Sequence, residues 1–334
     1  RGTIMNRRNL ISAALGFGAL AATARFLLPG DPVRDFEPHV LTGHALGTNV
    51  SLLALHADAG QARTALAEAL AEVQAVDALM SLYRDDSQLA ELNRTGMLAR
   101  PDARVLEVLR YARDLSARTA GAFDVTVQPL WQAFRQAQVQ GGLPTVESLD
   151  AARLRVDWRR LEISDESVRL PPGMAVTLNG VAQGYAADRA LAALRRHGVA
   201  HALIDAGEYD ALGDKRGAPW VLGVRAPRDA DALAARLAMS GRALATSGDY
   251  ETFFTPDFLH HHIFDPATGA SPTALASATV LAASALEADG LSTAFMVLGA
   301  ERSLALAATL PGVDALLIAK DGRSWRTPGL PALA

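Results

Sequence analysis

The sequence predicts one intertwined α+β fold, built either as a single body or as two lobes with a ligand site between them. Stretches with helical spacing of apolar residues alternate with short stretches of strand character, and the connections between them are long. Half of the 334 residues are hydrophobic, which is enough to bury one large domain or two modest ones. No repeat or low-complexity segment interrupts this pattern.

Composition and charge exclude several classes of function. The net charge of −4 argues against a nucleic-acid-binding protein, because such proteins neutralise phosphates with Lys and Arg. The chain has no cysteine, so disulfides, thiol nucleophiles and cysteine metal sites are excluded. Neither G-x-G-x-x-G nor G-x-x-x-x-G-K-[ST] occurs, which removes the usual nucleotide-binding fingerprints.

Residues 1–24 are predicted to be an export signal of the twin-arginine type. Arg7 and Arg8 precede a short, mildly apolar run over 11–20, and the A-x-A site Ala22–Ala24 follows. The alternative is an uncleaved N-terminal anchor. We therefore expect the mature protein in the periplasm or an equivalent space.

In the first half of the chain, the run N-V-S-L-L-A-L over 49–55 predicts a strand after a glycine-bearing bend. Apolar residues at helical intervals predict a helix over 58–80, and Asp102 is expected to cap another. The polar stretch 136–153 is predicted to be a surface excursion. Residues 156–170 are predicted to form a hairpin.

In the second half, a strand–glycine–helix unit is predicted to begin at Ala175, with the strand ending at Leu178 and the helix ending near Gly198. Its turn offers backbone N–H groups at a helix N-terminus, where anions bind, although many such turns bind nothing. A second helix is predicted over 286–298. Further strands are predicted over 201–206, 220–224, 276–283 and 315–319.

A polar stretch from Ala245 to Gly269 combines hydroxyls, aromatic rings and three consecutive histidines with two predicted turns. The turns are Ser247–Asp249 and Asp265–Gly269, where Asp, Gly and Pro favour chain reversal. Between them, His262-Ile263-Phe264 is predicted to be a short strand. A tight polar corner of this kind suits a phosphate or a sugar. Alternatively, the three histidines form a solvated loop or a chance metal-binding tract.

Two smaller features also allow both a functional and a structural interpretation. Asp289 and Thr293 are four residues apart, so their oxygens share one helical face and suit Mg²⁺. Alternatively, the carboxylate complements the helix dipole and the threonine bonds to its own backbone. Tyr83 follows the end of a predicted helix, where its ring either faces a pocket or packs with its hydroxyl in water.

Taken together, eight motifs resemble those of the ApbE family, the FAD:protein FMN transferases. They follow the family's order from about His39 to Lys320. The motifs are L-G-T at Leu46, M-S-L-Y at Met80, G-A-F-D-V-T-V-Q-P-L at Gly121, N-G-V-A-Q-G-Y-A-A-D at Asn179, A-G-E at Ala206, A-T-S-G-D-Y at Ala245, H-I-F-D-P-A-T-G at His262 and E-A-D-G-L-S-T-A at Glu287.

The resemblance implies that residues 39–330 form a transferase domain that binds FAD with Mg²⁺. Such an enzyme moves FMN onto a Thr or Ser hydroxyl of a partner protein, forming a phosphoester and releasing AMP. The implied partner is an acceptor flavoprotein domain, periplasmic and membrane-anchored. A twin-arginine-exported branch of the family serves maturation of the nitrous-oxide reductase system, and this chain is similar to that branch in its N-terminus.

The resemblance also implies roles for single residues. Asp289 and Thr293 match the family's metal ligands, with the Gly180 carbonyl as a third. His262 matches a histidine beside the reacting phosphate, and its neutral form would accept the hydroxyl proton. The implied FAD-binding residues are Leu46, Tyr83, Ala122, Phe123, Asp124, Thr177, Gln183 and Ile263. On this hypothesis the neighbours of the catalytic histidine, His260 and His261, are solvated.

The chain departs from the family's pattern at several of these positions. The family usually has Met at Leu46, Asp at Thr177 and Lys at Gln183, and its Gly-Gly-Glu is Ala206-Gly207-Glu208 here. Replacing the lysine removes a cation near a phosphate, and replacing the aspartate removes a polar contact. These changes bear on catalytic rate and flavin affinity, not on the fold.

Two other functions fit the same residues. A periplasmic FAD-binding protein without transferase activity would need Tyr83 and Asp124 and could dispense with the metal or His262. An FAD pyrophosphatase would use the same site and pass FMN to water, so only the acceptor differs. The presence of both Asp289 and His262 favours the transferase.

The export hypothesis predicts the fate of a double variant. Arg7→Lys together with Arg8→Lys should leave the protein in the cytoplasm, because the paired arginines are the export address. Cell fractionation and immunoblotting measure this. Normal export of the double variant would refute a twin-arginine signal and favour general secretion.

Overall fold

The computed structural model describes residues 36–333, and the predicted export signal lies outside them. Its centre is an eight-stranded sheet in which all paired neighbours are antiparallel. In spatial order the strands are β1 (Glu37–Ala45), β2 (Thr48–His56), β6 (His201–Asp205), β7 (Tyr209–Leu212), β10 (Ala243–Gly248), β11 (Leu275–Ala282), β12 (Asp314–Ala319) and β13 (Ser324–Arg326).

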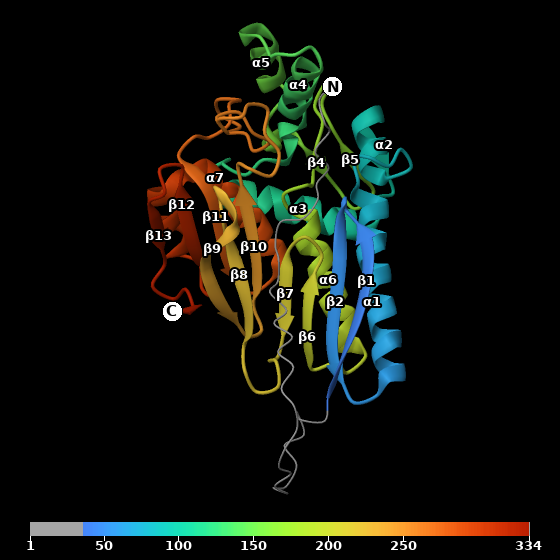
Figure 1. Cartoon of the computed structure of the whole chain (residues 1–334). Helices are drawn as coiled ribbons and strands as arrows, with labels where there is room; N and C mark the ends of the chain where they lie inside the picture. Colours follow the sequence, from blue (N-terminus) through green and yellow to red (C-terminus); the bar gives the residue numbers. More distant parts are fainter. Residues whose placement is uncertain (1–35, 334) are drawn as a thin grey trace, which may run out of the picture.

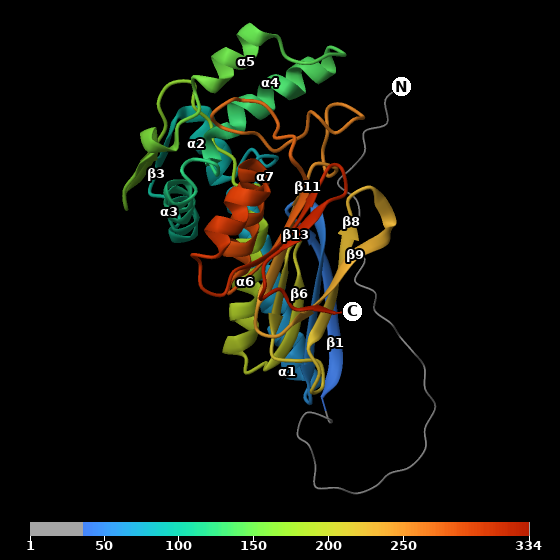
Figure 2. The ribbon, with the colours of Figure 1, turned by 90° about the vertical axis from the view of Figure 1, so that its left-hand side faces the viewer.

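Three long helices cover one face of this sheet, and a smaller sheet covers the other (Figures 1 and 2). The helices are α1 (Ala59–Met80), α6 (Ala182–Arg196) and α7 (Ala285–Ala307). The smaller sheet has the order β14 (Ala332–Leu333), β9 (Asp229–Met239) and β8 (Trp220–Ala226). The main sheet is therefore the middle of three layers.

Strand β2 illustrates why the middle layer is apolar on both sides. Side chains alternate across a strand, so Leu52 and Ala54 face the helices while Leu53 and Leu55 face the smaller sheet. In β11 every residue is buried. A strand with two covered faces needs a nearly continuous apolar run, and this is the pattern of 49–55.

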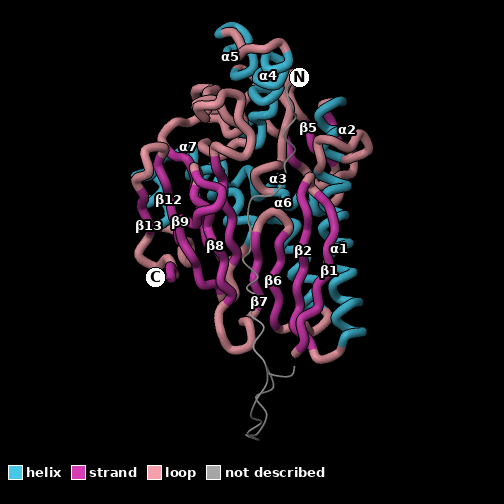
Figure 3. The backbone as a smooth tube through the Cα atoms, viewed as in Figure 1, coloured by secondary structure: helices cyan, strands magenta, loops and turns pink. Residues whose placement is uncertain are grey.

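The remaining elements gather around one end of the main sheet (Figures 1 and 3), where α3 packs against α1 and α7. They are the helices α2 (Gln88–Thr95), α3 (Ala103–Arg118), α4 (Gln128–Val139) and α5 (Val146–Arg153), the 3₁₀ turns Val125–Val127 and Trp158–Arg160, and a sheet of β3 (Met97–Ala99), β5 (Ser167–Arg169) and β4 (Glu162–Ile163). A separate apolar cluster joins α4 and α5 to the loop after β10 through Phe134, Phe254 and Phe264.

The α+β class predicted from the sequence is confirmed, and most predicted elements are present. The helix predicted over 58–80 is α1, and the helix that Asp102 was expected to cap is α3. The helix predicted to end near Gly198 is α6. The strands over 49–55, 201–206, 220–224, 276–283 and 315–319 and the hairpin over 156–170 are also found. The helix predicted over 286–298 is longer, because α7 continues past a kink at Gly299.

Two predicted strands are wrong. Residues 175–178 form no strand, because the Asn93 side chain bonds to the backbone N–H and C=O of Val176 at 2.7 and 2.8 Å. Residues 262–264 form no strand either. The His262 N–H donates to the Thr252 carbonyl within the same loop.

Two predicted loops also need correction. Ser247 and Gly248 are the end of β10, so the first turn begins at Asp249; the turn over 265–269 is confirmed. The polar stretch 136–153 contains the end of α4 and all of α5, because polar residues still form helices that lie on the surface. Among residues 36–333, no helix has the length and apolarity that crossing a membrane requires.

Strand β1 was not predicted from the sequence, although the turn that follows it contains a glycine. Leu46 and Gly47 both have positive φ, 53° and 75°, and together they form the two-residue hairpin turn between β1 and β2. Gly47 favours this conformation, whereas Leu46 is an unusual residue for it. The turn places Leu46 beside α1, where its N–H donates to Asp77 Oδ1 at 3.0 Å.

Because α6 and α7 lie so close together, adding one methyl group at their contact should strongly destabilise the fold. A Cβ at Gly184 would collide with the Ala285 carbonyl oxygen and lie 2.8 Å from the Asp289 Cβ. Gly184→Ala should therefore destabilise the fold by about 1–3 kcal/mol, measured by urea titration. In Gly142→Ala, the control, the new Cβ meets no atom within 4 Å. Equal stability of the two variants would contradict this packing.

Candidate active site

The candidate site begins where α6 crosses α7. Because Gly184 has no side chain, the two helices approach closely enough for its N–H to donate to Asp289 Oδ2 at 3.0 Å. Asp289 is buried, and burial, followed by the nearby carboxylate of Asp188, raises the pKa of Asp289 to about 7. A buried carboxylate of this kind is costly unless a cation or hydrogen bonds stabilise it.

One turn further along α7, Thr293 faces the segment before α6. A Cβ at Gly180 would lie 3.0 Å from Thr293 Oγ1 and 3.4 Å from a ring carbon of Phe123. The Ser247 hydroxyl, at the end of β10, lies 3.2 Å from Thr293 Oγ1. The structure thus brings together Gly180, Asp289 and Thr293, the three predicted metal ligands, within one α6–α7 junction.

A second carboxylate, Glu208, joins this junction from the turn between β6 and β7. It is buried and accepts a hydrogen bond from the Thr246 N–H at 3.2 Å. Burial and then the neighbouring Asp289 raise the pKa of Glu208 well above its usual range. The sequence contained Glu208 in its A-G-E motif but gave no reason to assign it a role, because the proximity to Asp289 exists only in the fold.

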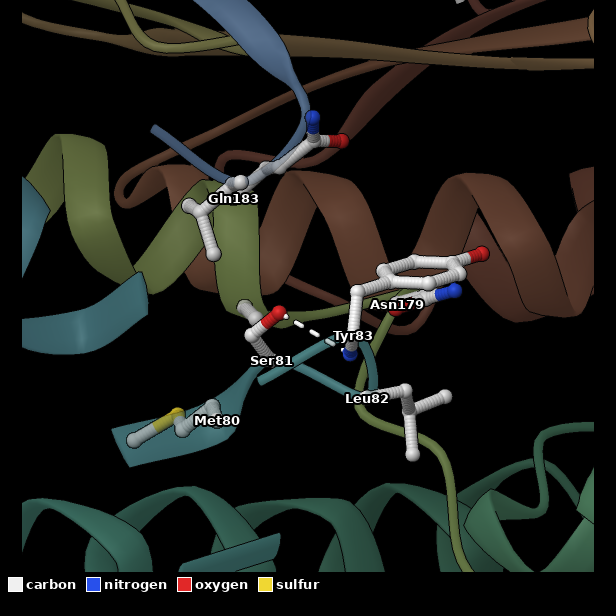
Figure 4. Close-up of a pocket in the computed structure, with 8 residues that line it drawn as sticks. Met80, Ser81, Leu82, Tyr83, Asn179 and Gln183 are labelled. Carbon is white, nitrogen blue, oxygen red and sulfur yellow. Dashed lines mark hydrogen bonds between the residues drawn. The ribbon is translucent and has the colours of Figure 1, made fainter. Parts of the chain in front are cut away.

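A small, shallow pocket opens beside this junction (Figure 4). Leu46, Tyr83 and Gln183, all predicted to bind FAD, lie on its wall together with Asn179. The pocket is lined by Leu46, Met80, Ser81, Leu82, Tyr83, Asn179, Ala182 and Gln183. Tyr83 is 66% exposed, so much of its side chain lies at the surface of the pocket wall. Its N–H donates to Ser81 Oγ, which helps fix the turn after α1.

Gln183 connects the pocket to the carboxylate cluster. A Cβ at Gly207 would lie 2.5 Å from Gln183 Nε2, so the amide rests directly against the β6–β7 turn. Gly207 has a φ of 99°, which residues with side chains rarely adopt. The position predicted to contact FAD is therefore next to Glu208 rather than isolated in the pocket.

Asp124 organises the backbone around the predicted flavin-binding segment. One carboxylate oxygen accepts from the N–H and hydroxyl of Thr126, both at 2.7 Å, and the other accepts from the Trp158 N–H at 3.1 Å. Burial raises the pKa of Asp124. Its neighbours Ala122 and Phe123 are buried, and the Thr177 N–H donates to the carbonyl of Val125.

The three consecutive histidines have three different environments. His261 is fully buried, with Nε2 donating to the Pro272 carbonyl at 2.9 Å, and burial lowers the pKa of His261 to about 4. The expectation that His261 is solvated is therefore wrong: it is a structural residue of the loop. His260 is half-buried and packs near Phe134, with ring centroids 6.0 Å apart.

His262 has the tautomer that a general base requires. Its Nδ1 lies 3.1 Å from the Thr252 carbonyl, which can only accept, so Nδ1 carries the proton and Nε2 the lone pair in the neutral ring. The backbone N–H of His262 bonds to the same carbonyl at 3.0 Å. Ile263, also predicted to bind FAD, is buried directly after it.

The donor set at the α6–α7 junction fits a small hard cation. It combines a carboxylate, a hydroxyl and a backbone carbonyl, all oxygen ligands of the kind Mg²⁺ prefers. Gly180 leaves space at Thr293 that a side chain would fill. Within the described part of the chain, no group of three or more His, Cys, Asp or Glu is placed to hold a metal. The predicted set contains one carboxylate and does not depend on such a group.

The sequence model of the ApbE family matches residues 46–317, and the chain belongs to that family. It is 30% identical to the FAD:protein FMN transferase of Salmonella typhimurium, over 92% of this chain and 94% of that protein. It is also 30% identical to the Escherichia coli K12 protein of the same name, over 92% and 93% of the two chains.

Solved structures show the same architecture. The flavin transferase ApbE from Vibrio cholerae superposes with a TM-score of 0.75 at 29% identity, over 88% of this chain and 98% of that one. The ApbE protein from Thermotoga maritima gives a TM-score of 0.79 at 27% identity, over 87% and 97%. The mixed α+β fold is thus that of the ApbE structures.

The buried His261 predicts a specific pH dependence of stability. Its pKa is about 4 in the folded protein and near 6.5 when unfolded, so the unfolded state binds more protons between these values. The free energy of unfolding should therefore fall by about 3 kcal/mol as pH drops from 7 to 4, at about 1.4 kcal/mol per pH unit. Urea titrations of wild type and His261→Asn measure this; the variant should lack this part of the decrease, and identical pH profiles would contradict the assignment.

Proposed function

We propose that this protein transfers FMN from FAD to a Thr or Ser hydroxyl of a partner protein with the help of Mg²⁺. The observation that carries the proposal is the convergence of Gly180, Asp289 and Thr293 at the α6–α7 junction, next to the pocket lined by Tyr83. Membership of a family whose named relatives are FAD:protein FMN transferases supports the same reaction.

Asp289, Thr293 and the Gly180 carbonyl are the residues that would hold Mg²⁺. When bound there, the ion would neutralise charge on the diphosphate of FAD, which phosphoryl transfer requires. Leu46, Tyr83 and Gln183 would bind and orient the dinucleotide in the adjoining pocket. Orientation matters because the attacking and leaving oxygens must lie in line at phosphorus.

His262 would act on the acceptor. Its Nε2 takes the proton of the acceptor hydroxyl as that oxygen forms a bond to the phosphorus of the FMN half. The bond between this phosphorus and the bridging oxygen breaks, and AMP leaves with that oxygen. The products are a phosphoester-linked FMN and free AMP. The hydrogen bond from Nδ1 to the Thr252 carbonyl holds the proton on Nδ1, so in the neutral ring the lone pair is on Nε2.

We also propose that the reaction takes place outside the cytoplasm. The paired arginines and the A-x-A site in residues 1–24 support export by the twin-arginine route. The acceptor is then a periplasmic, membrane-anchored flavoprotein domain. The net charge of −4 is consistent with protein and dinucleotide partners rather than nucleic acid.

An in-gel flavin assay tests the proposal and its metal. Incubated with FAD, Mg²⁺ and a candidate acceptor, the protein should leave flavin fluorescence on the acceptor band of a denaturing gel. Excess chelator should abolish the signal, and Asp289→Ala should do the same while remaining folded by circular dichroism. Full transfer in chelator would contradict the metal. FMN and AMP released without labelling would indicate a pyrophosphatase, and FAD binding without turnover would indicate a carrier.

The role of His262 predicts a separation of rate from binding. His262→Ala should lower the single-turnover transfer rate by roughly 10²–10⁴-fold. FAD affinity should change much less, because a general base contributes mainly in the transition state. His260→Ala is the matched control and should transfer within a few-fold of wild type. Normal transfer by His262→Ala, or an inactive His260→Ala, would show that the base has been assigned to the wrong residue.

A further inference from the structure

One buried cation at the edge of the site has unused hydrogen-bond donors. The side chain of Arg225, on β8, is only 10% exposed. Its Nε and Nη1 are buried without a hydrogen-bond partner, and Nη2 lies 4.0 Å from Glu251 Oε1, which is too long for a hydrogen bond. A buried guanidinium with two unused donors is costly, so its position calls for a compensating ligand.

Local backbone irregularity directs this side chain inward. Residues Trp220, Leu222 and Val224 alternate into the core between the two sheets, and regular alternation would send Arg225 outward. The β8–β9 register instead shifts on both sides of Arg225, as in a β-bulge. Bulges re-aim side chains and are frequent next to active sites. Figure 2 shows this hairpin rising along the sheet face opposite the helices.

The guanidinium is held in place by an aromatic ring. Its carbon lies 5.0 Å from the centre of the Tyr250 ring, within the range of a cation–π contact. Tyr250 packs in turn on Gly248 at the end of β10, where an added Cβ would come within 2.5 Å of the ring. Stacking fixes the plane of a guanidinium and leaves its edge, which carries the N–H donors, to meet an anion.

The neighbouring groups connect Arg225 with the carboxylate cluster. Tyr250, which stacks on Arg225, packs on Gly248, and the preceding residue of β10, Ser247, lies 3.2 Å from Thr293 Oγ1 at the α6–α7 junction. Arg228 and Lys320, the other cations here, both bond to the buried Asp249, at 2.7 and 2.6 Å. Of these three cations, Arg225 is the one whose buried N–H donors, on Nε and Nη1, have no hydrogen-bond partner.

We propose that Arg225 binds an oxyanion of the FAD diphosphate through its Nε and Nη1 donors. This inference rests on the proposed function and identifies the protein's own positive contact to that substrate. The residues assigned above to the metal and the pocket include no Lys or Arg, so apart from the bound ion they give the diphosphate no positively charged partner. Arginine matches a phosphate with two parallel N–H···O bonds. Because Arg225 is nine-tenths buried, a small-molecule phosphate suits it better than a carboxylate on a docked protein.

Calorimetric binding of FAD and riboflavin in the presence of Mg²⁺ tests this proposal. Riboflavin shares the flavin ring but lacks the diphosphate. Arg225→Gln should weaken FAD binding by about 10- to 100-fold, the range of charge-assisted hydrogen bonds, and leave riboflavin affinity unchanged. Arg225→Lys, which keeps the charge but loses the paired donors, should fall between. Arg236→Gln on the exposed part of β9 removes the same charge and should change neither.

Unchanged FAD affinity in Arg225→Gln would overturn the proposal. Equal losses of FAD and riboflavin affinity would also overturn it, since they indicate a structural role. A higher KM for the acceptor with unchanged FAD affinity would assign the oxyanion to the acceptor instead and refute the diphosphate contact. The binding comparison does not use the transfer reaction. If wild-type protein binds FAD but labels no acceptor, the proposed function is contradicted, while the measured effect of Arg225→Gln on FAD binding still stands.

Discussion

The close approach of α6 and α7 is the constraint on which the candidate site depends. Only a residue without a side chain permits it at Gly184, where the backbone N–H reaches Asp289. The same crossing angle brings Thr293 against Gly180 one turn later. A carboxylate is thereby kept deep in the protein next to neutral oxygen donors, at a cost that a bound cation would offset.

The layers around this crossing supply the remaining parts of the site. The main sheet ends at the junction, so β10 contributes Ser247 and the β6–β7 turn contributes Glu208. The loop after β10 carries His262 and is fastened by the buried His261 and by aromatic contacts to α4. The smaller sheet adds Arg225 from the opposite face. Rigid elements thus hold groups that are distant in sequence.

Sequence patterns predicted what depends on local chemistry. Helical spacing located α1, α3 and α6, and the four-residue interval predicted that Asp289 and Thr293 share a face. Tertiary contacts decided the rest. The bond between Asn93 and Val176 replaces strand pairing over 175–178, and burial turns one of three adjacent histidines into a structural residue.

The roles of Glu208 and Arg225 were beyond sequence reasoning for the same reason. Neither lies in a spacing pattern that indicates chemistry, and both gain their significance from neighbours more than twenty residues away. The motif resemblance supplied the flavin and metal hypotheses, but it could not show that Gln183 rests on the β6–β7 turn. Such contacts follow from packing, which no local pattern encodes.

If the α6–α7 junction is a cation site, metal binding measures it directly, without relying on turnover. Mn²⁺, a paramagnetic substitute for Mg²⁺, can be titrated into the protein with FAD while the free ion is followed by electron paramagnetic resonance. Wild type should bind Mn²⁺, Thr293→Val should bind it more weakly, and Asp289→Asn should lose it. Unchanged Mn²⁺ binding in both variants would show that the junction is not a cation site.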